Sequence, residues 1–251
     1  MLNAHRPVFP LRADNPSWSV FDWCDQCHRK KGLVVWPDLP RLTEAHPQGE
    51  ALAALVARKI DAVEVCSAES LDLYHRLLNA GLRPALVGAS GREGPETRVG
   101  VVRTYAQLLP DQEKGLASWM EAIRAGRTFV STGPLLAITA VPGRVWRLRA
   151  ESVLAEQVEI LANGRAIATG TSTVEVEYVP MGTTWFAARC EGQSGFAHTS
   201  ATWADLPGLP WRGNLDRGFL TALEATSGRI ERPDVRSHLE DARRYLKGVG
   251  A

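Results

Sequence analysis

The residues with the most recognisable chemical spacing are Cys24, Cys27 and His28, which form a C-x-x-C-H pattern. This pattern attaches c-type haem through two thioethers, with the histidine as an axial ligand. Such a haem would also require export of the chain and a second axial ligand. A structural zinc ion would need four ligands, and no second C-x-x-C or H-x-H pair exists to complete them.

Helix packing is the alternative role for these two thiols, because the segment 17–31 is amphipathic. Ser17 can cap the start of this helix, and Gly32 can follow its end. In this interpretation both cysteines are core residues. The chain has only four cysteines, which are too few for a disulfide framework.

Three polar residues accompany the carboxyl ends of predicted parallel strands, where α/β proteins carry their functional groups. Asp38 follows the strand 33–36 and could bind a metal, act as a base or be a loop or cap residue. Glu64 lies inside the strand 62–66, so a fully buried carboxylate there must be paired, protonated or metal-bound. Ser90 follows a third strand but lacks the G-x-S-x-G context of a nucleophile.

The six histidines offer no paired metal-binding motif, since no two stand in an H-x-H or H-x-x-x-H relation. His75 falls in a predicted helix and His198 in a predicted β region. Each is expected to be a packed or surface histidine rather than a ligand.

Residues 32–105 alternate short β-branched runs with helical ones, a rhythm typical of βα units and a parallel sheet. The predicted strands cover 33–36, 62–66, 83–88 and 101–105. The predicted helices cover 50–59, 71–80 and 115–125. Such units need further βα units to complete a sheet.

After Arg127 the pattern changes to strands and tight turns, which predicts a small β-sandwich. Asn163-Gly164 lies between two apolar runs and predicts a type I′ hairpin, because that turn needs positive φ at both central positions. Further strands are expected at 173–179, 185–190 and 196–203. The stretch 214–247 carries two apolar stripes at helical spacing and is predicted to be helical.

The composition of the 251 residues is that of an ordinary globular protein with one or two domains. The 29 basic and 28 acidic residues give a formal charge of +1, and the basic residues are scattered, so we expect no nucleic-acid partner. No apolar stretch approaches the ~20 residues that a bilayer requires, so we expect no membrane partner. Without an export signal, a cytoplasmic location is the default expectation.

Motifs spread over nearly the whole chain resemble one known family. The segments similar to the second half of a PHP (polymerase and histidinol phosphatase) barrel are 32–37, 61–65, 74–81 and 103–105. The run Gly-Arg-Thr-Phe-Val-Ser-Thr-Gly-Pro-Leu-Leu at 126–136 is close to the signature of the carbaryl-hydrolase branch, CehA/McbA. The segments that resemble the C-terminal β-domain of that branch are 163–165, 185–189 and 197–200.

The resemblance implies an α/β plus β fold. Residues 1–132 would form the C-terminal half of a distorted TIM-like barrel, residues 133–205 a small β-sandwich and residues 206–251 a C-terminal helical extension. It also implies two or three divalent ions, often zinc, manganese or iron. A metal-bound hydroxide would attack an ester, amide, carbamate or phosphate of a small-molecule substrate.

The residues at the family's ligand positions differ from that expectation. Asp38 stands where the family has a histidine, Ser90 stands where it has an aspartate, and the early H-x-H strands are absent. A metal-bound hydroxide needs several anionic or imidazole donors around the ion. We therefore expect the isolated chain to be inactive and to hold no metal. Asp38 is the metal candidate, Ser90 marks a lost ligand, Glu64 is a further strand-end candidate, and no catalytic residue is assigned.

Two origins and one other function stay open. The chain could be an incomplete gene product or a degenerate homologue that keeps the scaffold for another role. In either case the strand edge at 33–36 would need a partner chain or a second copy to cover it. The alternative function is a non-catalytic binding or scaffold module that uses the β-sandwich, with Trp203 and Trp211 as the aromatic residues to inspect.

Overall fold

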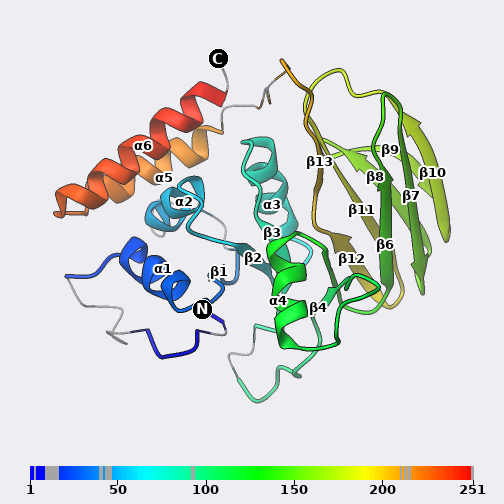
Figure 1. Ribbon diagram of the computed structural model, residues 1–251, viewed down its shortest axis with the longest axis horizontal. Coiled ribbons are helices and arrows are strands. Elements are labelled where there is room, and N and C mark those ends of the chain that lie inside the picture. Colours follow the sequence, from blue (N-terminus) through cyan, green and yellow to red (C-terminus); the bar gives the residue numbers. More distant parts are fainter. Residues whose placement is uncertain are drawn as a thin grey trace.

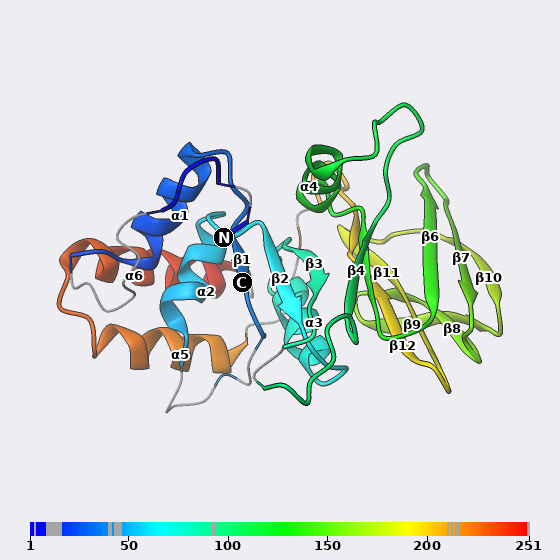
Figure 2. The same cartoon turned by 90° about the horizontal axis from the view of Figure 1, so that it is seen from below.

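A short parallel sheet lies between a group of helices on one side and two antiparallel sheets on the other (Figure 1). The view from below shows the same order (Figure 2). The structure is a computed structural model that describes residues 1–2, 4–8, 17–39, 42, 47–91, 94–209, 211, 213 and 216–249.

The parallel sheet has three strands in the order β1-β2-β3. They are β1 (Val35–Trp36), β2 (Ala62–Val65) and β3 (Ala85–Gly88). Both faces of this sheet are covered, which explains why its strands are almost continuously apolar. At the outer edge Leu2 pairs with Leu33 through two backbone hydrogen bonds of 2.7 and 2.8 Å.

No closed barrel is formed by the strands that the structure describes. The fold is a mixed α/β arrangement of several sheets, and the predicted half of a TIM-like barrel is not confirmed. That a partner chain or a second copy covers the β1 edge stays a prediction.

Six helices surround this sheet and the neighbouring strands in the part of the chain described. They are α1 (Val20–Arg29), α2 (Gly49–Val56), α3 (Ser70–Asn79), α4 (Leu116–Arg124), α5 (Arg217–Ser227) and α6 (Pro233–Val249). Helix α2 packs against α5 and α6. The approach of α2 to α5 depends on Gly49, because a Cβ atom there would lie 2.5 Å from Oγ1 of Thr226 and 2.6 Å from the carbonyl oxygen of Ala222.

The ends of α1 differ from the predicted ones. Ser19, and not Ser17, caps the helix: its Oγ accepts the Asp22 N–H at 3.3 Å, and the Asp22 carboxylate accepts the Ser19 N–H at 2.8 Å. The helix ends at Arg29 with Lys30 as its C-cap, and Lys31 adopts the left-handed conformation with φ 59°, one residue before the predicted Gly32. The reciprocal bonds of a capping box explain the shift at the start.

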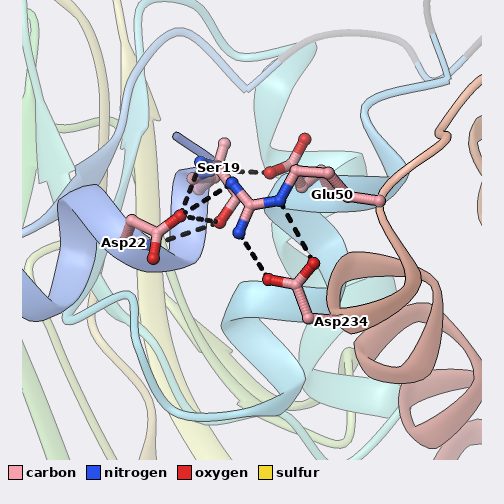
Figure 3. Close-up of polar contacts among 6 residues, drawn as sticks. Ser19, Asp22, Glu50 and Asp234 are labelled. Carbon is pink, nitrogen blue, oxygen red and sulfur yellow. Dashed lines mark hydrogen bonds and ion pairs between the residues drawn. The ribbon is translucent and has the colours of Figure 1, made fainter. Parts of the chain in front are cut away.

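A polar network fixes the start of α1 to two other helices (Figure 3). The Asp22 carboxylate accepts a hydrogen bond from Arg232 at 3.0 Å, and Arg232 also pairs with Asp234 at the start of α6. The Val20 N–H donates to Glu50 of α2 at 2.6 Å. Side chains thus satisfy N–H groups at the start of α1 that have no partner within the helix. The charged residues that do so connect α1, α2 and the start of α6.

The antiparallel strands form two sheets. The larger sheet has the order β4-β5-β12-β11-β8-β9, and β13 also pairs with β11. Its strands are β4 (Arg103–Ala106), β5 (Thr128–Ser131), β8 (Gln157–Ala162), β9 (Arg165–Gly170), β11 (Thr184–Gly192), β12 (Gly195–Thr199) and β13 (Thr202–Ala204). The smaller sheet has the order β10-β7-β6, with β6 (Leu135–Val141), β7 (Trp146–Val153) and β10 (Thr173–Tyr178).

The two sheets bury a common apolar cluster between them. Strand β7 alternates strictly between buried and exposed residues, as expected for a strand with one covered face. Strands β4 and β5 precede residue 133 but belong to the larger sheet, so this sheet crosses the predicted boundary at 132. The domain boundaries stay a prediction.

Two local predictions in this region had different outcomes. The Asn163-Gly164 turn is confirmed, with φ 51° and 82° at its two residues. The single strand predicted at 196–203 is wrong, because it is divided into β12 and β13. The Ser200 N–H bonds to the Thr128 carbonyl at 2.8 Å, and the Ala201 N–H bonds to the Tyr74 hydroxyl at 3.0 Å, so the ladder is interrupted there.

Hydroxyl side chains join β3 to the larger sheet. The Thr128 hydroxyl donates to the Leu86 carbonyl at 2.6 Å, and the Leu86 N–H donates to the Ser200 hydroxyl at 2.8 Å. The Thr104 hydroxyl bonds to both the N–H and the carbonyl of Gly88, at 2.8 and 2.9 Å. The backbone groups on this edge of β3 are therefore satisfied without a fourth parallel strand.

None of the helices described combines the length and the apolar character needed to cross a membrane.

Candidate functional site

The C-x-x-C-H residues lie in and against the core. Cys24 is 1% exposed and Cys27 is fully buried. Burial and the neighbouring Asp25 raise the pKa of Cys24 to about 12, so this thiol stays protonated. His28 Nε2 lies 2.9 Å from an Asp61 carboxylate oxygen, which also accepts the Val34 N–H. These residues do not fit a covalently attached haem, which needs accessible thiols and an open histidine.

The structure brings Asp38, Glu64 and Cys66 together at the carboxyl ends of β1 and β2. The Glu64 carboxylate accepts the Asp38 N–H at 3.2 Å and contacts the Cys66 thiol at 3.8 Å. The Glu64 carbonyl accepts the Leu39 N–H at 2.8 Å. Glu64 is half-buried and paired, while Asp38 is exposed with φ 42°. Both carboxylate residues therefore shape the loop that follows β1.

Cys66 contributes no anionic donor to this group. Burial, followed by the charges of Glu64 and Asp38, raises the pKa of the thiol to about 12. A cysteine binds a metal as the thiolate, so an ion would have to displace the thiol proton before it could bind Cys66.

Ser90 stabilises the loop that follows β3. Its hydroxyl accepts the N–H groups of Gly100 at 2.8 Å and Val101 at 3.1 Å, so it closes the glycine-rich loop after β3. No hydrogen bond links Ser90 to Asp38 or Glu64 among the described residues. The serine therefore acts as a loop residue.

These donors do not fit the hydrolytic metal centre that the family resemblance implies. No group of three or more His, Cys, Asp and Glu side chains able to hold an ion occurs in the part of the chain that the structure describes. A catalytic zinc ion takes three protein ligands and keeps one open position. Asp38 and Glu64 supply two carboxylates at most, which is fewer than a catalytic zinc ion needs.

A histidine pair that the sequence did not reveal joins α3 to β12, with His75 half-buried. The Nε2 atoms of His75 and His198 lie 2.8 Å apart, and His198 is fully buried. The two residues are 123 positions apart, so no local spacing signals their contact. Both are packed side chains, and Tyr74 lies edge-on to His198 with ring centroids 5.8 Å apart.

The hydrogen bonds determine the protonation of this pair. His198 Nδ1 lies 2.7 Å from the Thr199 carbonyl oxygen, so it must carry the proton that is donated there. With Nδ1 protonated, neutral His198 can only accept at Nε2, and His75 donates its Nε2–H. Nδ1 of His75 is then the nitrogen with a free electron pair.

Burial keeps both imidazoles neutral. It lowers the pKa of His75 to about 4, with a further contribution from the cation of Arg189. It lowers the pKa of His198 to about 3, with a further contribution from the neighbouring His75. A second proton on His198 would have to go to Nε2 and would leave two donors facing each other across 2.8 Å, whereas a second proton on His75 would go to its Nδ1.

His75 also lines a pocket of 610 Å³, which we call the α3–hairpin pocket. It lies between the end of α3 and the hairpin of β8 and β9. Side chains in its wall include those of His75, Asn79, Asn163, Arg165, Tyr178 and Trp211. Its volume falls in the range of small-molecule sites.

The two tryptophans singled out for inspection, Trp203 and Trp211, are both half-buried and have different roles. The Trp211 indole N–H donates to the Asn79 carbonyl at 3.2 Å, and its ring lines the pocket. Trp203 packs edge-on against Trp211 at 5.2 Å, with the Arg83 guanidinium 4.2 Å from its ring centroid. Trp211 thus belongs to a site, while Trp203 supports it.

Comparisons with known proteins give little guidance to function. No family model matches the chain, and no curated protein matches it. One similar solved structure is a two-domain protein from Bacteroides vulgatus ATCC 8482, described as containing a predicted PHP-like metal-dependent phosphoesterase. The likeness has 11% identity and a TM-score of 0.38, and it covers 80% of this chain and 68% of that one. At this distance it supports no inference about activity.

The neutral histidine pair predicts a pH-dependent stability. The ordinary pKa of histidine is 6.5, whereas that of folded His75 is about 4, so in this window the unfolded chain binds protons that the folded chain does not. The free energy of unfolding should fall by roughly 1–3 kcal/mol between about pH 6.5 and about pH 4 through this residue. Urea unfolding at several pH values measures it.

The variant His75→Gln should lose less stability over this window than the wild type, because glutamine does not titrate. His5→Gln, which changes an exposed histidine, is the matched control and should follow the wild type. Equal pH slopes for all three proteins would contradict the buried neutral pair.

Proposed function

We propose that this chain is a PHP-type hydrolase scaffold, similar to the CehA/McbA branch, whose strand-end residues stabilise loops instead of holding a hydrolytic metal. The ordered family motifs, centred on the run at 126–136, support the ancestry. The substrates of such an enzyme would be esters, amides, carbamates or phosphates, and the implied ions would be zinc, manganese or iron. On its own the chain would not hydrolyse them.

The hydrogen bonds of the strand-end residues carry this proposal. Glu64 is engaged with the Asp38 N–H, and Ser90 is engaged with the N–H groups of its own loop. The thiol of Cys66, whose pKa is raised to about 12, is protonated beside them. A divalent ion would have to displace these bonds and would gain two carboxylates at most, which is fewer than hydrolytic sites provide.

Metal content and hydrolysis test the proposal together. After dialysis against Zn²⁺ or Mn²⁺ and removal of free ion, the full chain should hold much less than one ion per molecule. With added metal, p-nitrophenyl acetate and p-nitrophenyl phosphate should be hydrolysed at the rate of the buffer blank. Elemental analysis and absorbance of p-nitrophenolate measure both quantities.

A bound ion in stoichiometric amount would overturn the proposal if turnover accompanied it and was lost in Asp38→Ala. Asp111→Ala, at an exposed loop position, is the control for that variant. Turnover that persists unchanged in both variants would indicate a contaminating hydrolase and would leave the chain inactive, as proposed.

A second candidate function is ligand binding without catalysis, and the α3–hairpin pocket favours it. The pocket combines the hairpin and β10 with His75 and Asn79 of α3. The antiparallel sheets alone therefore do not complete it. A chain shortened to 133–251 would also lose β4 and β5 from the larger sheet, so binding has to be tested on the full chain.

A ligand-observed NMR screen of small polar fragments tests this second function. Some fragments should bind the full chain, and their signals should be lost in Trp211→Ala, which removes one wall of the pocket. Trp119→Ala, on α4, is the matched control and should keep them. If no fragment depends on Trp211, the pocket is not a binding site.

A further inference from the structure

The α3–hairpin pocket has a wall that is held in place before any ligand arrives. Asn79 accepts the Trp185 indole N–H on its side chain at 3.0 Å and the Trp211 indole N–H on its carbonyl at 3.2 Å. The Asn163 side chain accepts the Trp185 backbone N–H at 3.0 Å. The hairpin and the end of α3 are thus connected through one tryptophan. A preformed site binds with a smaller loss of conformational entropy.

Among the lining residues that the structure describes, Arg165 carries a positive charge and none carries a carboxylate. No ion pair to Arg165 occurs within the part of the chain that the structure describes. His75 is neutral, because burial lowers its pKa to about 4. An anion can therefore pair with the guanidinium without displacing a protein carboxylate.

The remaining lining groups suit a ligand that also carries hydroxyls. Side-chain amides of Asn79 and Asn163 and the phenol of Tyr178 can accept or donate hydrogen bonds. The tautomer of His75 adds an acceptor, since its Nδ1 holds the free electron pair. The rings of Trp211 and Tyr178 offer apolar contact beside these polar groups.

We propose that the α3–hairpin pocket binds a small hydroxylated acid, the size of a monosaccharide, whose carboxylate or phosphate pairs with Arg165. This inference rests on the second of the two proposed functions and names its ligand class. A neutral sugar would leave the cation without a partner, and a bare anion would leave the amides and aromatic rings without contacts.

Calorimetric titration of the full chain tests the ligand class with four probes. They are D-glucuronate, D-glucose 6-phosphate, D-glucose and inorganic phosphate. At least one of the two sugar acids should bind about 10-fold more tightly than glucose, because a charge-assisted pair contributes that much. The same acid should bind about 10-fold more tightly than inorganic phosphate, because the amides and aromatic rings of the pocket wall also contribute binding free energy. The two acids distinguish a carboxylate ligand from a phosphate ligand.

Arg165→Gln should weaken binding of the preferred acid about 10-fold and leave glucose unaffected. Arg147→Gln changes another exposed strand arginine, on the smaller sheet, and should bind as the wild type does. Thermal unfolding of both variants confirms that they are folded.

Three results would overturn the inference. The first is that the wild type binds glucose as tightly as the two sugar acids. The second is that Arg165→Gln binds the preferred acid as tightly as the wild type does, and the third is that no probe binds at about 10 mM. If fragments that depend on Trp211 still bind in these cases, only the ligand class is wrong. If such fragments do not bind either, the second proposed function fails with it.

Discussion

Hydroxyl hydrogen bonds along one edge of β3 are the constraint on which the rest of this structure depends. A central parallel strand normally pairs with a strand on each side, and an unpaired buried backbone is costly. Here Thr104, Thr128 and Ser200 supply the missing donors and acceptors from β4, β5 and the residue after β12. Thr128 and Ser200 also lie within 2.7 Å of each other, so these two hydroxyls form one buried group.

This junction determines where the candidate pocket can form. Because β3 meets the larger sheet, α3 comes to lie beside β11 and β12 (Figure 1). Tyr74 then reaches the Ala201 N–H, His75 reaches His198, and Asn79 reaches the indole of Trp185. The wall of the pocket is thus a consequence of the way in which the two kinds of sheet are joined. The strand ends, in contrast, have their polar groups engaged in loops.

Sequence patterns predicted the local parts of this fold well. The βα rhythm gave the strands and helices up to α4 with ends shifted by a few residues, and Asn163-Gly164 gave its turn, because these signals depend on neighbouring residues. The start of α1 was misplaced, since Ser17 and Ser19 both have the chemistry of a cap and only the bonds to Asp22 decide between them.

The candidate site could not be predicted in the same way. His75 and His198 were expected to be ordinary packed or surface residues, and nothing near either one in the sequence indicates the other. Glu64 is only half-buried, and its carboxylate accepts the Asp38 N–H, a contact that residue spacing does not indicate. Contacts between distant residues depend on the packing of whole elements, which residue spacing does not record.

Native-state hydrogen exchange tests most directly whether the junction makes the two kinds of sheet one unit. In the wild type, the most protected amides of β3 and of β11 should exchange through the same global opening. Thr128→Val should lower the protection of both strands by the same free energy, while Thr139→Val, at an exposed position of β6, should leave both unchanged. Loss of protection in β3 alone, with β11 as protected as before, would contradict this account.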